Sequence, residues 1–161
     1  MTRTARPSLD TFFFIPIVIG DALYETPRHF SGQRDSIDNS MNSIDYGKIV
    51  YFQPKLGYRS GIEPIILASQ ANNKDKTILD LGSGCGPISL ILAHRFANAE
   101  IVGLENNTFH LELSQRSKIE NKFSNVEFKK EDVCKINKDY ISYFDLVLSN
   151  PPFFFENQII K

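Results

Sequence analysis

Short apolar runs alternate with helical patterns through the last two thirds of the chain. Five runs are too short for helices and rich in Ile, Val, Leu and Phe, and each predicts a strand: 49–52, 77–81, 100–105, 126–128 and 144–149. Segments that begin at 62, 87 and 107 have the start signals or the apolar spacing of helices. The alternation of strands and helices indicates an α/β fold.

The helix predicted from 87 onward has one core face, formed by Ile88, Ile91, Leu92 and Phe96. Asn107 or Thr108 is expected to cap the helix that follows the strand 100–105. His94 and His110 are expected to face solvent, because a lone histidine on a predicted helix is rarely a ligand or a catalyst.

An apolar run at 12–19 follows Arg3 and Arg6 and superficially resembles a signal peptide. Asp10 stands just ahead of the run, Pro16 interrupts it, and no small-residue cleavage site follows. The run is also too short to span a bilayer, so the sequence predicts neither export nor a membrane anchor.

The segment 26–43 is polar and without periodicity, as expected of a linker or a disordered stretch. Residues 1–40 are therefore expected to be a leader that is disordered or not native, with Met41 as the natural start. The domain is expected to occupy 41–161.

Composition places the chain among ordinary single-domain proteins. Its 161 residues are 42% hydrophobic and 23% charged, which is enough for a sizeable core. The net charge of −1 gives no global basic footprint, so RNA binding would need a local patch. Cys85 and Cys134 lack metal-site spacing, which suggests neither zinc nor a disulfide framework and fits a reducing cytoplasm.

The run 77–81 is followed by three alternating glycines, Gly82, Gly84 and Gly86. Glycines between a strand and a helix allow a ligand to approach the backbone and the free N–H groups of the helix start. A dinucleotide motif would require glycine where Pro87 stands. The observed spacing, counted from Asp80, is D-x-G-x-G-x-G. The simpler alternative is a glycine-rich turn in which Asp80 only caps a loop.

Glu105 ends the next predicted strand, roughly 20 residues beyond the glycines, where a ribose diol finds its acidic acceptor in nucleotide-binding folds. The alternative is an acid that only favours the start of the following helix.

The last predicted strand runs into Asn150-Pro151-Pro152-Phe153. Two prolines cannot continue a strand, so they fix the direction in which the chain leaves the carboxyl edge of the sheet. The alternative is a plain turn.

These motifs resemble those of class I S-adenosylmethionine-dependent methyltransferases of the N-P-P-[FYW] branch. Between 44 and 155 the chain closely resembles bacterial tRNA(Val) adenine-N(6) methyltransferases, and the segment 52–63 is the most family-specific part. Asp80 to Gly86 and Asn150 to Phe153 are also shared with ribosomal RNA guanine and protein glutamine methyltransferases. Phe153, where glutamine enzymes usually have tyrosine, favours a nucleobase.

The resemblance implies S-adenosyl-L-methionine as cofactor. The cofactor-binding residues would be Asp80, Gly82, Ser83, Gly84, Gly86, Glu105, Asp132 and Arg59. Asp132 would face the adenine, and the loop of Arg59 would close over the site. Glu63 stands where the family is expected to have an aspartate. The catalytic motif would be Asn150, Pro151, Pro152 and Phe153, with Asn150 orienting the target amine and Phe153 stacking on the base.

By resemblance, a complete enzyme has a seven-stranded sheet ordered 3-2-1-4-5-7-6. This chain is expected to supply a partial Rossmann-like methyltransferase fold, strands 1 to 4 in the order 3-2-1-4, with an N-terminal strand-loop-helix extension. The expected activity is methyl transfer to an exocyclic amino group of a nucleobase, adenine in tRNA. The alternatives are a ribosomal RNA guanine or protein glutamine methyltransferase, or a fragment of the fold that binds cofactor without activity.

Overall fold

The computed structural model describes residues 39–44, 47–56 and 59–151. The strands are β1 (Asn39–Ile44), β2 (Ile49–Pro54), β3 (Thr77–Leu81), β4 (Glu100–Glu105), β5 (Val126–Lys130) and β6 (Leu146–Ser149). The helices are α1 (Glu63–Ala68), α2 (Pro87–Arg95) and α3 (Thr108–Glu120), with short 3-10 helices at Val133–Lys135 and Lys138–Tyr140. No helix within the described ranges is long and apolar enough to cross a membrane.

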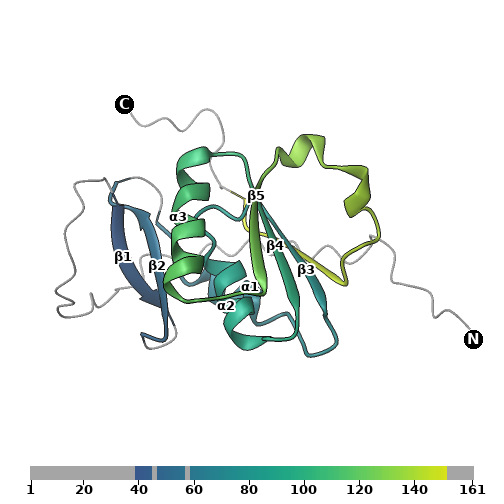
Figure 1. Ribbon diagram of the computed structural model, residues 1–161, viewed down its shortest axis with the longest axis horizontal. Coiled ribbons are helices and arrows are strands. Elements are labelled where there is room, and N and C mark those ends of the chain that lie inside the picture. Colours follow the sequence, from purple (N-terminus) through teal and green to yellow (C-terminus); the bar gives the residue numbers. More distant parts are fainter. Residues whose placement is uncertain (1–38, 45–46, 57–58, 152–161) are drawn as a thin grey trace, which may run out of the picture.

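The central sheet is parallel and has the strand order β5-β4-β3-β6. This matches the α/β prediction and the expected order of its first four strands. Because α2 and α3 connect neighbouring strands in the same direction, right-handed crossovers place both on one face. The return from β5 to β6 crosses the opposite face, as Figure 1 shows for the segment 131–145.

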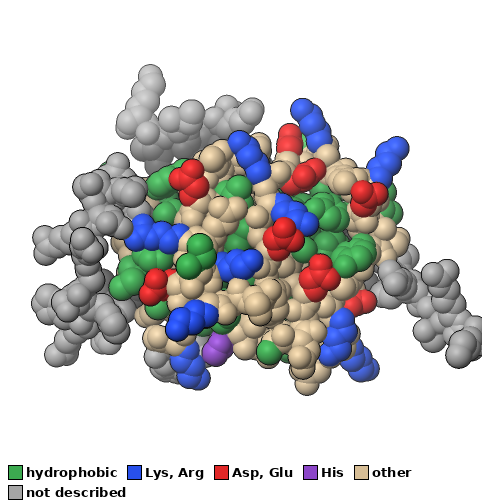
Figure 2. Space-filling view, viewed as in Figure 1, with side chains coloured by type: hydrophobic (Ala, Val, Ile, Leu, Met, Phe, Trp, Pro, Cys, Tyr) green, Lys and Arg blue, Asp and Glu red, His purple; other side chains and the backbone are tan. Residues whose placement is uncertain are grey.

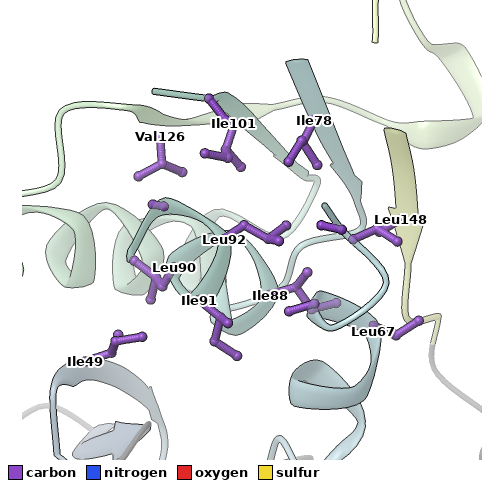
Figure 3. Close-up of a cluster of buried hydrophobic side chains, with 14 of the residues drawn as sticks. Ile49, Leu67, Ile78, Ile88, Leu90, Ile91, Leu92, Ile101, Val126 and Leu148 are labelled. Atoms are coloured by element: carbon purple, nitrogen blue, oxygen red, sulfur yellow. The ribbon is translucent and has the colours of Figure 1, made fainter. Parts of the chain in front are cut away.

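Helix α2 is buried on every side from Pro87 to Ala93. The sequence predicted a single apolar face, but Ser89 and Leu90 are fully buried as well. Figure 3 shows the reason: sheet residues lie on one side of α2, and residues of β2 and α1 lie on the other. The residues that enclose it include Ile78, Ile101, Val126, Ile49 and Leu67. A helix packed between a sheet and two further elements is apolar all round.

The opposite face of the sheet is covered by the connection between β5 and β6. Leu79, Val102 and Leu104 are buried there, under partly buried Ile136, Tyr140 and Phe144. The end of this connection is fixed to the start of β3, because Asp145 Oδ2 accepts hydrogen bonds from the N–H groups of Lys76 and Thr77 and from the Thr77 hydroxyl.

A two-stranded hairpin precedes the central sheet. Strand β1 pairs antiparallel with β2, from Asn39 opposite Pro54 to Ile44 opposite Ile49. This corrects the expectation that the chain is unstructured up to Ser43. No apolar alternation predicts a strand there, and β1 is formed by backbone pairing with β2.

Side chains from α3 and from its C-cap, Asn121, satisfy the other edge of β2. Asn121 Oδ1 accepts from Val50 N at 2.9 Å, and Ser117 Oγ accepts from Phe52 N at 2.9 Å. The Arg116 guanidinium lies 4.1 Å from the centre of the Phe52 ring. The hairpin is therefore docked on a helix instead of joining the central sheet, and the exposed backbone of a strand edge is avoided.

Basic and acidic side chains are interspersed on the face shown in Figure 2. This face has no field of a single sign, in keeping with the net charge of −1. Long-range attraction of a polyanion is therefore not expected from it, and any contact with nucleic acid would depend on local groups.

Phe128 occupies the space that two glycines leave open. A Cβ at Gly86 or Gly103 would lie 2.6 or 2.7 Å from atoms of the Phe128 ring. Gly86 also has φ +84°, in the left-handed region, whereas Gly103 is a strand residue without positive φ. The glycine at 103 is thus required by packing alone.

Replacing Gly103 with alanine should destabilise the chain by roughly 1–3 kcal/mol, the usual cost of overpacking. Urea denaturation measures the difference. Adding Phe128→Leu, which removes the clashing ring, should make the Gly103→Ala change cost less than it does alone. Equal costs in both backgrounds would contradict the contact.

Candidate functional site

The candidate site lies where the strand order of the sheet reverses. Strands β4 and β5 lie on one side of β3, and β6 lies on the other. Open α/β sheets bind ligands outside the carboxyl ends of their strands at this point. Here the chain leaves β3 at Gly82 and β6 at Asn150, and both residues line one small pocket.

The pocket has a volume of about 70 Å³. It is lined by Gln53, Ser60, Pro64, Gly82, Ser83, Gly84, Cys85, Pro87, Ile88, His110 and Asn150. These residues come from β2 and the loop after it, the first turns of α1, α2 and α3, the glycine turn and the end of β6. The two motifs that the sequence places about 65 residues apart are therefore brought together, as expected of strand ends that share one edge.

The glycine turn has an open side. Gly82, Gly84 and Gly86 all adopt positive φ, at +67°, +57° and +84°. A Cβ at Gly82 or Gly84 would meet no atom within 4 Å. The turn is fastened to β4 by a hydrogen bond from Ser83 N to the Leu104 carbonyl at 2.8 Å. This arrangement leaves the backbone of Gly82 and Gly84 accessible to a ligand, as the glycine spacing predicted.

Glu105 joins the glycine turn to the start of α3. Its Oε2 accepts from Gly84 N at 2.8 Å, and its Oε1 accepts from Asn107 N at 2.7 Å. Asn107 is the N-cap, one of the two residues that the sequence offered for it, and its side chain accepts from Phe109 N and His110 N. Since each carboxylate oxygen has a further lone pair, Glu105 can also accept hydrogen bonds from the two hydroxyls of a ribose.

Asp80 lies in the core beneath the turn. It is 1% exposed, and its Oδ2 accepts from the Ser89 hydroxyl at 2.6 Å. Its Oδ1 is buried and has no partner in the part of the chain that the structure describes. Burial raises the pKa of Asp80 from 3.8 to about 6, against the lowering effect of the hydrogen bonds from Ser89 and with a further increase from Glu105. Asp80 therefore holds α2 through its hydrogen bond with Ser89, and it does not line the pocket.

Asn150 follows the last residue of β6. Ser149 Oγ donates to the Leu81 carbonyl at 2.9 Å, which ties the carboxyl ends of β6 and β3 together. Asn150 is half-buried at the pocket, and half-buried Pro151 follows it. Pro152 and Phe153, the other two residues of the predicted catalytic motif, lie outside the described residues.

Arg59 and Asp132 do not line the pocket. The Arg59 guanidinium donates to Ser40 Oγ at 3.1 Å and to Asn42 Oδ1 at 2.7 Å, which anchors its loop to β1. The Asp132 side chain accepts from Cys134 N and caps a 3-10 helix. Their cofactor contacts stay predictions, because the structure gives both side chains other partners.

The sequence analysis did not single out His110 and Gln53, which are among the polar residues that line the pocket. His110 was expected to face solvent, but it is half-buried and lines the pocket, because this side of α3 faces the β1–β2 hairpin. Gln53 is 4% exposed. The available signal for Gln53 was its position directly after the apolar run 49–52. Nothing in the sequence predicted that the hairpin packs beside α3.

Cys85 also lines the pocket but is unsuited to nucleophilic chemistry. Burial raises the pKa of its thiol to about 12, and the negative charge of Glu105 contributes. The thiol is therefore protonated at neutral pH and acts as a small apolar side chain in the turn.

The raised pKa of Asp80 predicts a pH-dependent stability. Between pH 3.8 and about 6 the folded chain keeps a proton that the unfolded chain has lost, so the stabilising contribution of this group is present below 3.8 and is lost as pH rises through 6. Asp80→Asn, which does not titrate, should gain on the order of 3 kcal/mol over wild type between pH 4 and pH 7. Urea unfolding at four pH values tests this, with exposed Glu112→Gln as control. A pH-independent difference would contradict it.

Comparisons with known proteins identify the family. A model of the methyltransferase small domain matches residues 64–161. The release factor glutamine methyltransferase of Fusobacterium nucleatum is 36% identical over 81 residues, with coverage of 50% of this chain and 22% of that protein. The tRNA1(Val) (adenine(37)-N6)-methyltransferase of Glaesserella parasuis is 38% identical over 95 residues, covering 56% and 38%. The chain thus spans less than half the length of these two curated relatives.

A solved structure supports the fold. The Pyrococcus abyssi tRNA (uracil-54, C5)-methyltransferase in complex with S-adenosyl-L-homocysteine has a TM-score of 0.56 and 20% identity, with coverage of 72% of this chain and 29% of that one. At this identity the likeness shows a Rossmann-like methyltransferase fold and no more. The family model matches more than half of the residues of this chain, and the chain therefore belongs to the methyltransferase small domain family.

Proposed function

We propose that this chain binds S-adenosylmethionine and transfers its methyl group to an exocyclic amino group of a nucleobase, adenine in tRNA, in the cytoplasm. One observation carries the proposal: Asn150 lines the same pocket as Gly82 and Gly84. The group that would orient the acceptor and the turn that would hold the cofactor therefore lie at one point of the sheet.

The residues present fit this cofactor. Gly82 and Gly84 leave open space beside their backbone, and Glu105 offers carboxylate oxygens at the end of β4. Asp80 and Glu105 place two acidic groups near the turn, which suits a cationic ligand. When bound, the cofactor supplies a sulfonium methyl group that is already activated for transfer.

The chain itself would orient the acceptor. The Asn150 carboxamide oxygen can accept one hydrogen of an exocyclic amine, and the backbone carbonyl that follows can accept the other. The two acceptors would direct the nitrogen lone pair to the methyl group. Pro151 removes a backbone donor and restricts the chain at this point, so the two acceptors keep a fixed direction. Acceptors held in place before the reaction lower its entropic cost.

An RNA substrate is supported by the relatives and by local charge. A relative named tRNA1(Val) (adenine(37)-N6)-methyltransferase, from a Flavobacteriaceae bacterium, is 28% identical over 123 residues, or 73% of this chain. Exposed Lys55 lies in the loop after β2, and exposed Lys130 ends β5 at the carboxyl edge of the sheet. These are the local cations that a chain with net charge −1 would need for phosphate contacts.

A second candidate is methylation of a protein glutamine. The release factor glutamine methyltransferase noted above supports it, because a glutamine side chain also ends in an NH₂ group that the two acceptors at Asn150 could orient. Phe153 favours the nucleobase, since aromatic stacking on a base is worth about 1–3 kcal/mol.

Cofactor affinity should depend on Glu105 and Gly84. Glu105→Gln replaces one acceptor oxygen with a donor and should weaken S-adenosylmethionine binding by about 1–3 kcal/mol. Gly84→Val should abolish binding, because it fills the open side of the turn and disfavours its positive φ. Calorimetry measures both, with exposed Glu112→Gln as a charge-matched control. Wild-type affinity in both variants would refute the cofactor site.

Asn150 should act on turnover. Asn150→Ala should lower methyl transfer to total tRNA by about 100-fold or more while cofactor affinity is kept, the pattern of an interaction used mainly in the transition state. Nucleoside mass spectrometry identifies the product, exposed Asn98→Ala is the control, and a release factor is the competing acceptor. Methylation of the release factor alone would favour the second candidate. Loss of cofactor binding in Asn150→Ala would make Asn150 structural.

A further inference from the structure

The loop between β2 and α1 begins and ends at the wall of the pocket. Gln53, near the end of β2, and Ser60, ahead of α1, both line it. Between them along the chain lies Leu56, whose side chain is 85% exposed. It is the most exposed large hydrophobic side chain in the part of the chain that the structure describes. Leu56 therefore contributes little to the core, and its place beside the pocket calls for another reason.

Hydrogen bonds fix both ends of this loop. Ser60 N donates to Gln53 Oε1 at 3.2 Å, and Gln53 is itself 4% exposed. The Arg59 guanidinium donates to the Pro54 carbonyl at 3.3 Å and to Asn42 Oδ1 of β1 at 2.7 Å. The base of the loop is thus anchored to the β1–β2 hairpin, and this limits how far the residues between its ends can lie from the pocket.

A single exposed leucine is common on protein surfaces and by itself indicates nothing. Lys55 and Leu56 place an exposed cation beside an exposed apolar side chain. The same pair of residue types occurs at Lys118 and Ile119 of α3, where Ile119 is 74% exposed. The feature that distinguishes Leu56 is its position, because its loop forms part of the pocket wall that includes Asn150.

Leu56 lies within reach of an RNA whose acceptor base enters the pocket. It follows Gln53 by three residues, which span at most about 11 Å when fully extended. The pocket has a volume of about 70 Å³, and Asn150 is half-buried in its wall. An exocyclic amine can reach a recessed group of this kind only if its base leaves the stack, as enzymes that act on bases generally require. The gap that the base leaves in the stack would then face the loop.

Extrusion of a base costs free energy, because the contacts with its stacked neighbours are lost. Proteins that open a base step commonly insert an apolar wedge into the gap, and leucine is one of the side chains that serve in this way. A cation beside the wedge can contact a phosphate and so fix the position of the RNA backbone. Exposed Leu56 and Lys55 provide these two groups on a loop with an anchored base.

We propose that Leu56 is a wedge that enters the RNA stack at the place of the extruded acceptor base, with Lys55 contacting an adjacent phosphate. The inference rests on the proposed function, because it presumes a nucleobase as acceptor. Leu56 is in this sense a positioning residue, since it acts on the stack and not on the reacting atoms. It should matter only for RNA in which the acceptor base is stacked.

Two RNA hairpins distinguish a wedge from a general RNA contact. Both contain the stem-loop around adenine 37 of tRNA1(Val), the base named for the Glaesserella parasuis relative. In the second hairpin the next nucleotide is abasic, so the adenine has already lost a stacking neighbour. Leu56→Ala should lower methyl transfer to the first hairpin about ten-fold or more and to the second by less than about two-fold. Leu56→Met keeps an apolar side chain of similar size and should restore transfer to the first.

Base extrusion can also be measured without turnover. 2-Aminopurine in place of the acceptor adenine fluoresces more strongly when it leaves the stack. With saturating S-adenosylhomocysteine, the wild-type chain should raise this fluorescence in the first hairpin. Leu56→Ala should remove the increase at protein concentrations that saturate the RNA, and its affinity for S-adenosylhomocysteine should be unchanged.

Ile119→Ala is the matched control. It also removes an exposed apolar side chain that follows a lysine, but it lies toward the end of α3 and does not line the pocket. It should leave both hairpins unaffected. Lys55→Ala should weaken the binding of both hairpins to the same extent, because a phosphate contact does not depend on stacking.

The outcomes are distinct. Loss on the fully stacked hairpin alone, with recovery in Leu56→Met, supports the wedge. Equal losses on both hairpins, no loss on either, or the same pattern in Ile119→Ala would overturn it and leave the proposed function standing. A changed oligomeric state of Leu56→Ala in light scattering would make Leu56 part of a contact between copies and would also overturn it. A wild-type chain that methylates a release factor and neither hairpin would overturn the nucleobase function together with this inference.

Discussion

The Glu105 carboxylate connects the parts of the molecule from which the site is built. One oxygen holds Gly84 N of the turn after β3, and the other holds Asn107 N at the start of α3. The carboxylate thereby satisfies two backbone N–H groups. Both hydrogen bonds are charge-assisted, because the acceptor is ionised. The end of β4 thus determines how the glycine turn lies relative to α3. A ribose bound by the same carboxylate would be placed by the group that shapes the turn.

The second connection is the docking of the hairpin on α3. Ser117 and Asn121 take the place of a neighbouring strand along β2, and they bring Gln53 to the pocket. Because α3 begins at the cap that Glu105 holds, the same helix positions His110 on the pocket and carries the hairpin farther along its length. Gln53 and His110 are therefore both positioned by one helix, although they come from distant parts of the sequence.

The sequence predicted best what depends on local spacing. Three glycines after β3, the acid at the end of β4 and Asn150 after β6 each follow a short apolar strand, and parallel pairing brings strand ends to one edge. The sequence-based prediction failed where strands and helices contact each other across long sequence separations. Strand β1 consists mostly of polar residues. Its pattern therefore predicted neither its pairing with β2 nor the packing of the hairpin on α3. His110 and Gln53 were missed for the same reason, because the placement of the hairpin decides what they face.

Asp80 combines a cost to folding with a benefit to binding. Its carboxyl is fully buried, and one oxygen has no partner among the residues that the structure describes, so the charged form is disfavoured and the pKa rises to about 6. A cation bound above the turn would offset that cost, so such a ligand gains more attraction there than at a solvated carboxylate. In the proposed reaction, methyl transfer would remove the positive charge of the sulfonium. The same buried carboxylate would then bind the neutral product less strongly than the cationic cofactor, which favours exchange of product for cofactor at neutral pH.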